Sequence, residues 1–192
     1  VPSLSLLSQT LREWTFASNE SFDVLCVCSD ETVGKKSGYD TLVQSVNDLS
    51  FPVTSDAEEI SHFLKAKGSK VIFSTYHSSP LIAESQSNNK VPVFELVISD
   101  EAHRCTGAVG SSFTTVLDET LIKAKRRLFT TATPKTYTAN LKKNAEERGV
   151  EITGMDDEVV FGKVFYSLPF GEAIKQKLLT DYQVVIVGVD KP

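Results

Sequence analysis

The stretch VFELVISDEAHRCTG, residues 93–107, places an apolar run directly before two adjacent carboxylates, Asp100 and Glu101. The run itself, VFELVIS, has the length and the apolar, partly β-branched content of a buried strand. The two acids and the nearby His103 therefore stand where a strand stops. Because ligands of parallel sheets bind at the carboxyl ends of the strands, the stretch predicts reactive side chains at such an edge.

Further short apolar segments lie on both sides of this stretch and alternate with helical patterns. Strands are predicted at 22–29, 70–75, 93–99, 126–131 and 182–189. Helices are predicted at 4–14, 54–68, 80–86, 113–125, 135–149 and 171–179, and residues 29–50 are predicted to form a loop. Ser3 is the expected N-cap of the first helix, and Thr54 or Ser55 that of the second. This alternation favours an α/β fold with a parallel β-sheet covered by helices on both faces.

Composition and charge exclude several classes of protein. The chain has 192 residues, 41% of them hydrophobic and 23% charged, which is ordinary for a soluble globular domain with a substantial core. Its net charge of −5 argues against a wholly basic protein that coats nucleic acid, but not against phosphate contacts along one narrow surface. No apolar run is long enough for a membrane helix, and no signal peptide is evident, so we expect a cytoplasmic protein.

Two smaller observations concern the cysteines and the start of the chain. Cys26 and Cys28 lie two residues apart in a predicted strand and therefore on one face of it, and Cys105 stands alone. Their spacing matches no zinc site, so buried reduced thiols are expected. The chain begins at Val1 and its only methionine is Met155, from which we expect a piece of a longer protein.

The paired acids suggest a specific chemistry. Asp100, at the end of a strand, is placed to hold Mg²⁺, which prefers oxygen ligands and keeps several waters. Glu101 projects differently and could orient or deprotonate an attacking water. The alternative is a strand that ends in a solvated acidic turn.

A second motif decides between these readings. The segment LFTTATP, residues 128–134, ends another apolar strand in Thr131, Ala132 and Thr133. The pairing of D-E-A-H with T-A-T resembles motifs II and III of superfamily 2 helicases and translocases. The resemblance implies that Asp100 and Glu101 form a Walker B pair that works with Mg²⁺ and ATP. It also implies that His103 couples to the threonines of T-A-T.

Three further stretches resemble the nucleic-acid motifs of that family. They are the segment after Val1, which resembles motif Ia, FPVTSDAE, which resembles motif Ib, and VIFSTYHSS. The matching residues, which the resemblance assigns to nucleic-acid contacts, are Pro2, Ser3, Gln9, Thr54, Ser55, Ser74, Thr75 and Tyr76. The alternative for each of them is ordinary capping and turn chemistry.

The resemblance covers nearly the whole chain and implies a RecA-like domain. Residues 1–168 would be a truncated first RecA-like domain of the P-loop NTPase fold, and residues 169–192 a helix and strand leading toward a second domain. The narrower likeness is to the bacterial, phage or plasmid "predicted helicase" group related to type I and III restriction subunits. The segments PSLSLLSQTLREW and FSTYHSS carry that narrower likeness.

One expected element is missing. A phosphate-cradling loop has the pattern G-x-x-x-x-G-K-[ST], and the nearest segment has Ser29 in place of the first glycine and Lys36 in place of Ser or Thr. That segment also follows the wrong strand. We therefore expect this piece alone neither to bind ATP with useful affinity nor to hydrolyse it.

The sequence thus predicts part of the ATPase motor of a DNA helicase or translocase. Mg²⁺ and ATP are the cofactors expected in the parent protein. Duplex DNA and a second RecA-like domain of the same parent are the expected partners, and no membrane is expected. A non-catalytic docking module, an RNA helicase and a RecA-like ATPase with another substrate remain as alternatives.

Overall fold

The computed structural model describes residues 1–28, 51–87 and 91–181. Contacts within the chain define two units, Val1–Phe161 and Gly162–Pro192, and each is described by itself. In these described ranges, no helix combines the length and apolar character that crossing a membrane requires. The domain boundary expected after residue 168 stays a prediction.

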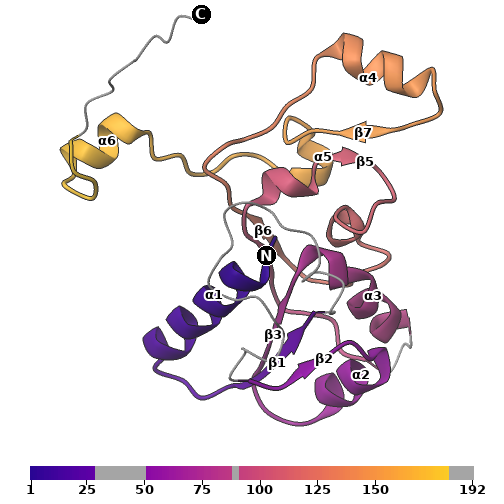
Figure 1. Cartoon of the computed structure of the whole chain (residues 1–192), viewed down its shortest axis with the longest axis vertical. Coiled ribbons are helices and arrows are strands. Elements are labelled where there is room, and N and C mark those ends of the chain that lie inside the picture. Colours follow the sequence, from indigo (N-terminus) through magenta and orange to yellow (C-terminus); the bar gives the residue numbers. More distant parts are fainter. Residues whose placement is uncertain (29–50, 88–90, 182–192) are drawn as a thin grey trace, which may run out of the picture. The chain divides into compact units, whose positions relative to one another are not determined.

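A three-stranded parallel ladder forms the first part of the larger unit (Figure 1). β1 (Asp23–Val27) lies between β2 (Val53–Thr54) and β3 (Lys70–Ser74), with Cys26 opposite Val53 and Leu25 opposite Ile72. The strands predicted at 22–29 and 70–75 are therefore confirmed, and so is the parallel sheet.

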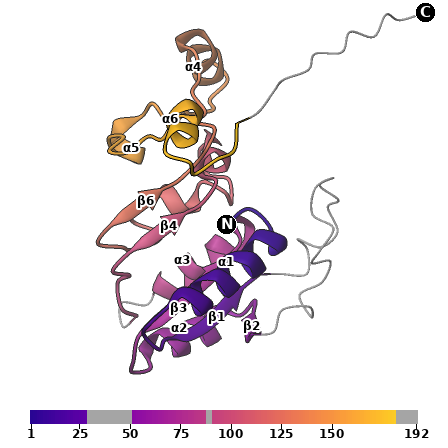
Figure 2. The same ribbon diagram turned by 90° about the vertical axis from the view of Figure 1, so that its left-hand side faces the viewer.

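Helices cover both faces of this ladder. Figure 2 shows α1 (Leu4–Ala17) on one face and α2 (Ala57–Lys65) and α3 (Ser79–Ser87) on the other. The alternation of β1 follows from this arrangement, because Leu25 and Val27 pack in a core with α2 and α3 residues. Cys26 and Cys28 point the other way, into a core that includes Leu4, Leu7 and Leu11 of α1. The two thiols share one buried face, as predicted.

The N-cap of α1 matches the sequence prediction, and that of α2 does not. Ser3 Oγ accepts a hydrogen bond from the Leu6 amide, as expected for an N-cap. At α2 the cap is Asp56, whose carboxylate accepts from the Glu58 amide at 2.7 Å, so the expectation of Thr54 or Ser55 was wrong. The reason is that Thr54 belongs to β2, and its hydroxyl instead accepts from the Asp56 amide and donates to Glu59.

A second parallel ladder joins β4 (Val97–Ser99) and β6 (Arg127–Phe129). A bridge between Phe94 and Ala124 precedes it. Beyond the strands, the Thr130 amide donates to Ser99 O and the Ala102 amide donates to Thr130 O. The strands predicted at 93–99 and 126–131 are confirmed with shorter bounds.

The helix predicted at 113–125 was wrong, since only a 3₁₀ turn, η5 (Thr115–Leu117), forms there. Side-chain hydrogen bonds compete with the helix near its start and in its middle. The Thr114 hydroxyl donates to Ser111 O, and Asp118 Oδ1 accepts from the amide and the hydroxyl of Thr120. Such local bonds offer the backbone an alternative to helical pairing.

The remaining elements are short. They are η3 (Tyr76–Ser78), η4 (Ala102–Cys105), β5 (Gly107–Ala108), α4 (Ala139–Glu146), β7 (Ile152–Thr153) and α5 (Glu158–Phe161) in the larger unit, and α6 (Phe170–Lys175) in the smaller. β5 and β7 pair antiparallel. The predicted helices at 80–86, 135–149 and 171–179 correspond to α3, α4 and α6, the last two shorter than expected. The loop predicted at 29–50 and the strand at 182–189 lie outside the described residues.

Candidate functional site

Three strand ends meet where the sequence placed its polar residues. The Tyr76 hydroxyl, just after β3, donates to the carbonyl of Asp100, just after β4. The Asp100 carboxylate accepts from the Thr130 hydroxyl, just after β6, at 3.0 Å. Burial raises the pKa of the Tyr76 hydroxyl well above its ordinary value, so it remains a donor. Asp100 is thus held at its backbone carbonyl from the end of β3 and at its carboxylate from the end of β6.

Glu101 has a backbone conformation that is rare outside glycine. Its φ of 51° and ψ of 45° lie in the left-handed region. A non-glycine residue there typically costs on the order of 1–3 kcal/mol and is often found at functional sites. The turn ends β4 and starts η4, and it brings Glu101 Oε2 to 3.2 Å from His103 Nδ1. The Glu101 side chain keeps 38% of its surface exposed, which leaves room for a water.

His103 lies between the acidic motif and the loop after β6. Its Nδ1 lies 2.9 Å from Thr131 Oγ1 and 3.3 Å from Thr133 Oγ1, in addition to its contact with Glu101. The Thr131 hydroxyl also accepts from the Thr133 amide, which holds the loop closed. A single ring nitrogen donates or accepts only one strong hydrogen bond at a time. The three oxygens therefore compete for Nδ1.

The structure also limits the kind of metal site that can form. Nowhere in residues 1–28, 51–87 and 91–181 do three His, Cys, Asp or Glu residues gather as a metal site would require. Asp100 supplies one carboxylate, and Mg²⁺ is commonly held by one or two carboxylates together with waters and substrate phosphates. The residues therefore fit a magnesium ion that arrives with a nucleotide, and they do not fit an all-protein cage.

The predicted nucleic-acid residues divide into two groups. Several have hydroxyls engaged within the protein: Ser3 caps α1, Thr54 bonds Asp56 and Glu59, Ser74 bonds Thr75 O, Thr75 bonds Ser78, and Tyr76 bonds Asp100. Gln9 and Ser55 are exposed, and Pro2 is half-buried. The contacts of these eight residues with nucleic acid stay predictions.

Ala132, which the resemblance assigns to motif III, is exposed between the two threonines of its loop. Its role in coupling stays a prediction.

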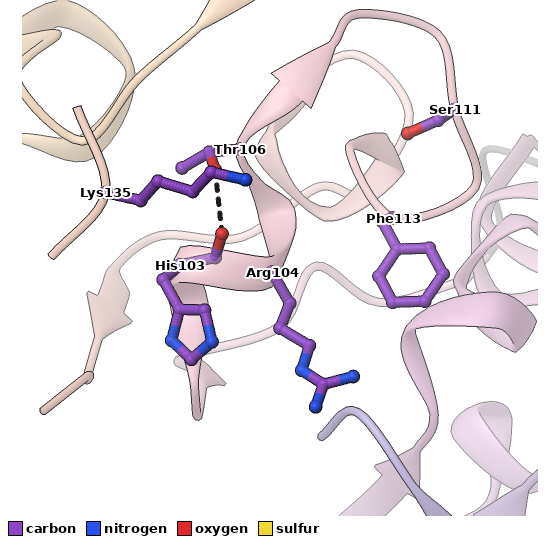
Figure 3. Close-up of a pocket in the computed structure, with 6 residues that line it drawn as sticks. All are labelled: His103, Arg104, Thr106, Ser111, Phe113 and Lys135. Carbon is purple, nitrogen blue, oxygen red and sulfur yellow. Dashed lines mark hydrogen bonds between the residues drawn. The ribbon is translucent and has the colours of Figure 1, made fainter. Parts of the chain in front are cut away.

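An open cavity of about 540 Å³ lies next to His103, and sequence reasoning missed it. Its lining consists of His103, Arg104, Thr106, Ser111, Phe113 and Lys135 (Figure 3). A signal was present in the sequence, because Arg104 directly follows D-E-A-H and Lys135 directly follows T-A-T-P.

Lys135 also acts on the neighbouring Tyr137. Its Nζ lies 5.3 Å from the centroid of the Tyr137 ring. Burial alone would raise the pKa of Tyr137, but hydrogen bonds with Thr106 and Lys135 and the charge of Lys135 hold it below its ordinary value. Lys135 therefore lies close enough to Tyr137 to favour the ionised form of the phenol.

Comparison with known proteins shows which family and fold the chain resembles. Residues 1–136 match the family model "Type III restriction enzyme, res subunit". Two isolates of African swine fever virus have a "Probable helicase A859L" that is 31% and 30% identical over all 192 residues of this chain. The chain spans 18% of the length of these relatives.

A solved structure is similar as well. It is a nuclease-deletion mutant of the type ISP restriction-modification enzyme LlaGI in complex with a DNA substrate mimic. The likeness has a TM-score of 0.69 and 32% identity, and it covers 95% of this chain and 14% of that one. The expected RecA-like α/β fold and the expected helicase relationship are thereby confirmed. The chain belongs to the family of the type III restriction enzyme res subunit.

Proposed function

We propose that this chain is the first RecA-like half of an ATP-driven motor that moves on nucleic acid, within a longer protein. The helicase relatives, of which it spans 18%, support a motor module of this type. The observation that carries the proposal is the contact of His103 Nδ1 with Thr131 and Thr133 on one side and Glu101 on the other. This contact connects the two motifs that the sequence pairs.

Each residue of the site has a proposed role in hydrolysis. Asp100 would hold Mg²⁺, directly or through water, and the ion would stabilise charge on the phosphates when the nucleotide is bound. Glu101 would orient and deprotonate the attacking water, because its carboxylate is partly exposed and lies one residue beyond Asp100. A phosphate-cradling loop and a second RecA-like domain would come from other parts of the parent protein.

His103 would couple the state of the nucleotide site to the loop of Thr131, Ala132 and Thr133. When His103 Nδ1 is hydrogen-bonded to Glu101, the Glu101 carboxylate is engaged by the protein. When Nδ1 is hydrogen-bonded to a threonine instead, the carboxylate is free to bind water. Competition for one nitrogen therefore offers a two-state element of the kind that coupling requires.

Nucleic acid is the proposed track, and duplex DNA is favoured because the LlaGI structure contains a DNA substrate mimic. Gln9 and Ser55 are the exposed candidates for contact, together with the half-buried Pro2 before α1. This surface would be supported through internal hydrogen bonds by Ser3, Thr54, Ser74, Thr75 and Tyr76. Attached nuclease or methyltransferase domains lie beyond this proposal.

The test is Glu101→Gln in the full-length parent protein. Hydrolysis of ATP should fall by about 10²- to 10⁴-fold, since a general base is lost, while binding of ATP persists. Glu84→Gln on α3 is the matched control, because Glu84 is also a glutamate and is exposed away from the strand ends. Turnover that survives in Glu101→Gln rejects this role for Glu101.

Two further measurements test the rest of the proposal. Stimulation of hydrolysis by nucleic acid separates a nucleic-acid motor from a RecA-like ATPase with another substrate. The 192-residue chain alone should show no magnesium-dependent turnover above background, because it lacks the G-x-x-x-x-G-K-[ST] loop. Turnover by the chain alone contradicts that expectation.

A further inference from the structure

The cavity beside His103 has the chemistry of an anion site. Two cationic side chains, Arg104 and Lys135, line it, together with the imidazole of His103 and the hydroxyls of Thr106 and Ser111. No carboxylate is among the lining residues. The cavity therefore differs in sign from the chain as a whole, whose net charge is −5.

Neither cation is paired with a carboxylate in residues 1–28, 51–87 and 91–181. Within the described residues, Arg104 and Lys135 take part in no salt bridge, whereas Lys70, Lys125, Arg127, Lys142 and Lys175 each pair with a carboxylate. Lys135 contacts the ring of Tyr137, a partner without a carboxylate charge. Both cations are exposed and can meet a ligand from solvent.

The lining residues come from segments that the fold brings together. Figure 3 shows His103 and Arg104 projecting from η4, Lys135 from the loop after β6 beside Thr106, and Phe113 across from Arg104. Phe113 packs edge-on with His77 and against the core, so this wall is part of the packed domain. The cations and hydroxyls around the rest of the cavity are groups that proteins use to contact nucleic-acid phosphates.

We propose that this cavity binds a backbone phosphate of the nucleic-acid strand on which the motor acts, with Arg104 and Lys135 as the two phosphate-binding cations. The inference rests on the proposed function and adds a contact site to it. An open cavity suits a phosphate within a continuous strand, which must enter and leave at its two sides. A volume of about 540 Å³ exceeds what a phosphate alone occupies and leaves room for the adjoining sugars.

His103 connects the proposed phosphate site to the D-E-A-H and T-A-T motifs. The same side chain lines the cavity and shares its Nδ1 between Glu101, Thr131 and Thr133. A phosphate held by Arg104 would therefore lie beside the residue proposed to couple the two motifs. Binding of the strand at this cavity could then affect Glu101 through the side chain of His103.

The experiment measures binding of a short fluorescent DNA duplex to the full-length parent protein over a series of salt concentrations. Arg104→Gln combined with Lys135→Gln should weaken binding about 10- to 30-fold and make the log–log salt slope shallower by about 1.8, because two cations that neutralise duplex phosphates are removed. The charge-preserving pair Arg104→Lys and Lys135→Arg should restore most of the affinity and the slope.

Lys65→Gln combined with Lys67→Gln is the matched control. It removes the same net charge from exposed positions at the end of α2, away from the cavity. It should leave the salt slope within error of the wild type. Thermal melting of every variant excludes unfolding as the cause of weaker binding.

The outcomes separate the inference from the proposed function. If the wild type binds duplex DNA and the cavity pair behaves like the Lys65 and Lys67 pair, the inference fails and the motor assignment stands. If the wild type binds neither duplex DNA nor an RNA duplex of the same sequence, both fail. If the cavity pair weakens ATP binding in the absence of nucleic acid but leaves DNA affinity unchanged, the phosphate belongs to the nucleotide, which overturns the assignment to a strand.

Discussion

The two parallel ladders of the larger unit serve different purposes. The β2–β1–β3 ladder carries helices on both faces, and Leu7, Val27 and Ile60 around it are completely buried. In the β4–β6 ladder, Ile98 keeps 37% of its surface exposed, yet the residues that follow these strands form the candidate site. The β2–β1–β3 ladder is distinguished by the burial of its side chains, and the β4–β6 ladder by the polar residues that follow its strands. Substitutions should therefore affect stability in the first and activity in the second.

The largest expected effect tests burial of α2 against the β2–β1–β3 ladder. Ile60→Ala should lower the free energy of unfolding by about 2–5 kcal/mol, because it removes a fully buried side chain and leaves a cavity. Ile98→Ala in β4 is the matched substitution, and it should cost well under half as much because Ile98 is partly exposed. Urea unfolding monitored by circular dichroism measures both. Equal losses would show that the two ladders are packed alike.

The second prediction concerns the hydrogen bond that joins the two ladders. Tyr76→Phe removes the hydroxyl that donates to the Asp100 carbonyl and should cost about 1–1.5 kcal/mol, because a partly buried acceptor loses its partner. Tyr166→Phe, at a residue that is 71% exposed, should cost almost nothing. Unfolding and nucleic-acid affinity are measured together. A loss of affinity without a loss of stability would instead support Tyr76 as a direct contact.

The third prediction uses Cys105, which lies two residues after the D-E-A-H motif and is buried in the core that Leu25 and Val27 form with α2 and α3. Burial raises the pKa of its thiol from 9.0 to about 11. The folded state therefore holds this proton more tightly than the unfolded state, and the corresponding stability is present below pH 9 and is lost as the pH rises toward 11. The loss should be about 1.4 kcal/mol per pH unit in this window.

Comparison of Cys105→Ala with the wild type isolates this thiol from other groups that titrate at high pH. The difference in unfolding free energy between the two proteins should shift in favour of the variant between pH 9 and pH 10. A difference that does not change with pH would mean that Cys105 ionises alike in both states.

Sequence patterns predicted the β2–β1–β3 ladder well because a buried face requires apolar residues at regular spacing. Leu4, Leu7 and Leu11 recur at helical spacing, and Cys26 and Cys28 at strand spacing, and both sets lie in the core where the patterns placed them. In the second ladder, the D-E-A-H and T-A-T motifs indicated which strand ends would meet. His103 and Thr131 do lie within hydrogen-bond distance, although their roles stay predictions.

Other features depended on information that the local pattern does not contain. The segment 113–125 has helical spacing, but hydroxyl and carboxylate bonds from Thr114 and Asp118 replace the helix. Glutamate rarely takes a left-handed conformation, so nothing in the sequence indicated the turn at Glu101. Arg104 and Lys135 are far apart in the chain, and each alone is typical of a solvated surface charge. Only the fold places them around one cavity.

The smallest expected effect concerns the boundary between β2 and α2, where a sequence prediction missed by one or two residues. Asp56→Ala should lower the free energy of unfolding by about 1 kcal/mol, because the Glu58 amide loses its capping carboxylate. Ser55→Ala should change it little, since Ser55 is exposed and does not cap the helix. Urea unfolding of the two variants at neutral pH compares them directly. If Ser55→Ala destabilises the protein more, then Ser55 is the N-cap, as the sequence predicted. If Asp56→Ala destabilises it more, then Asp56 is the N-cap, and the Ser55 side chain is available to contact a phosphate at the start of α2.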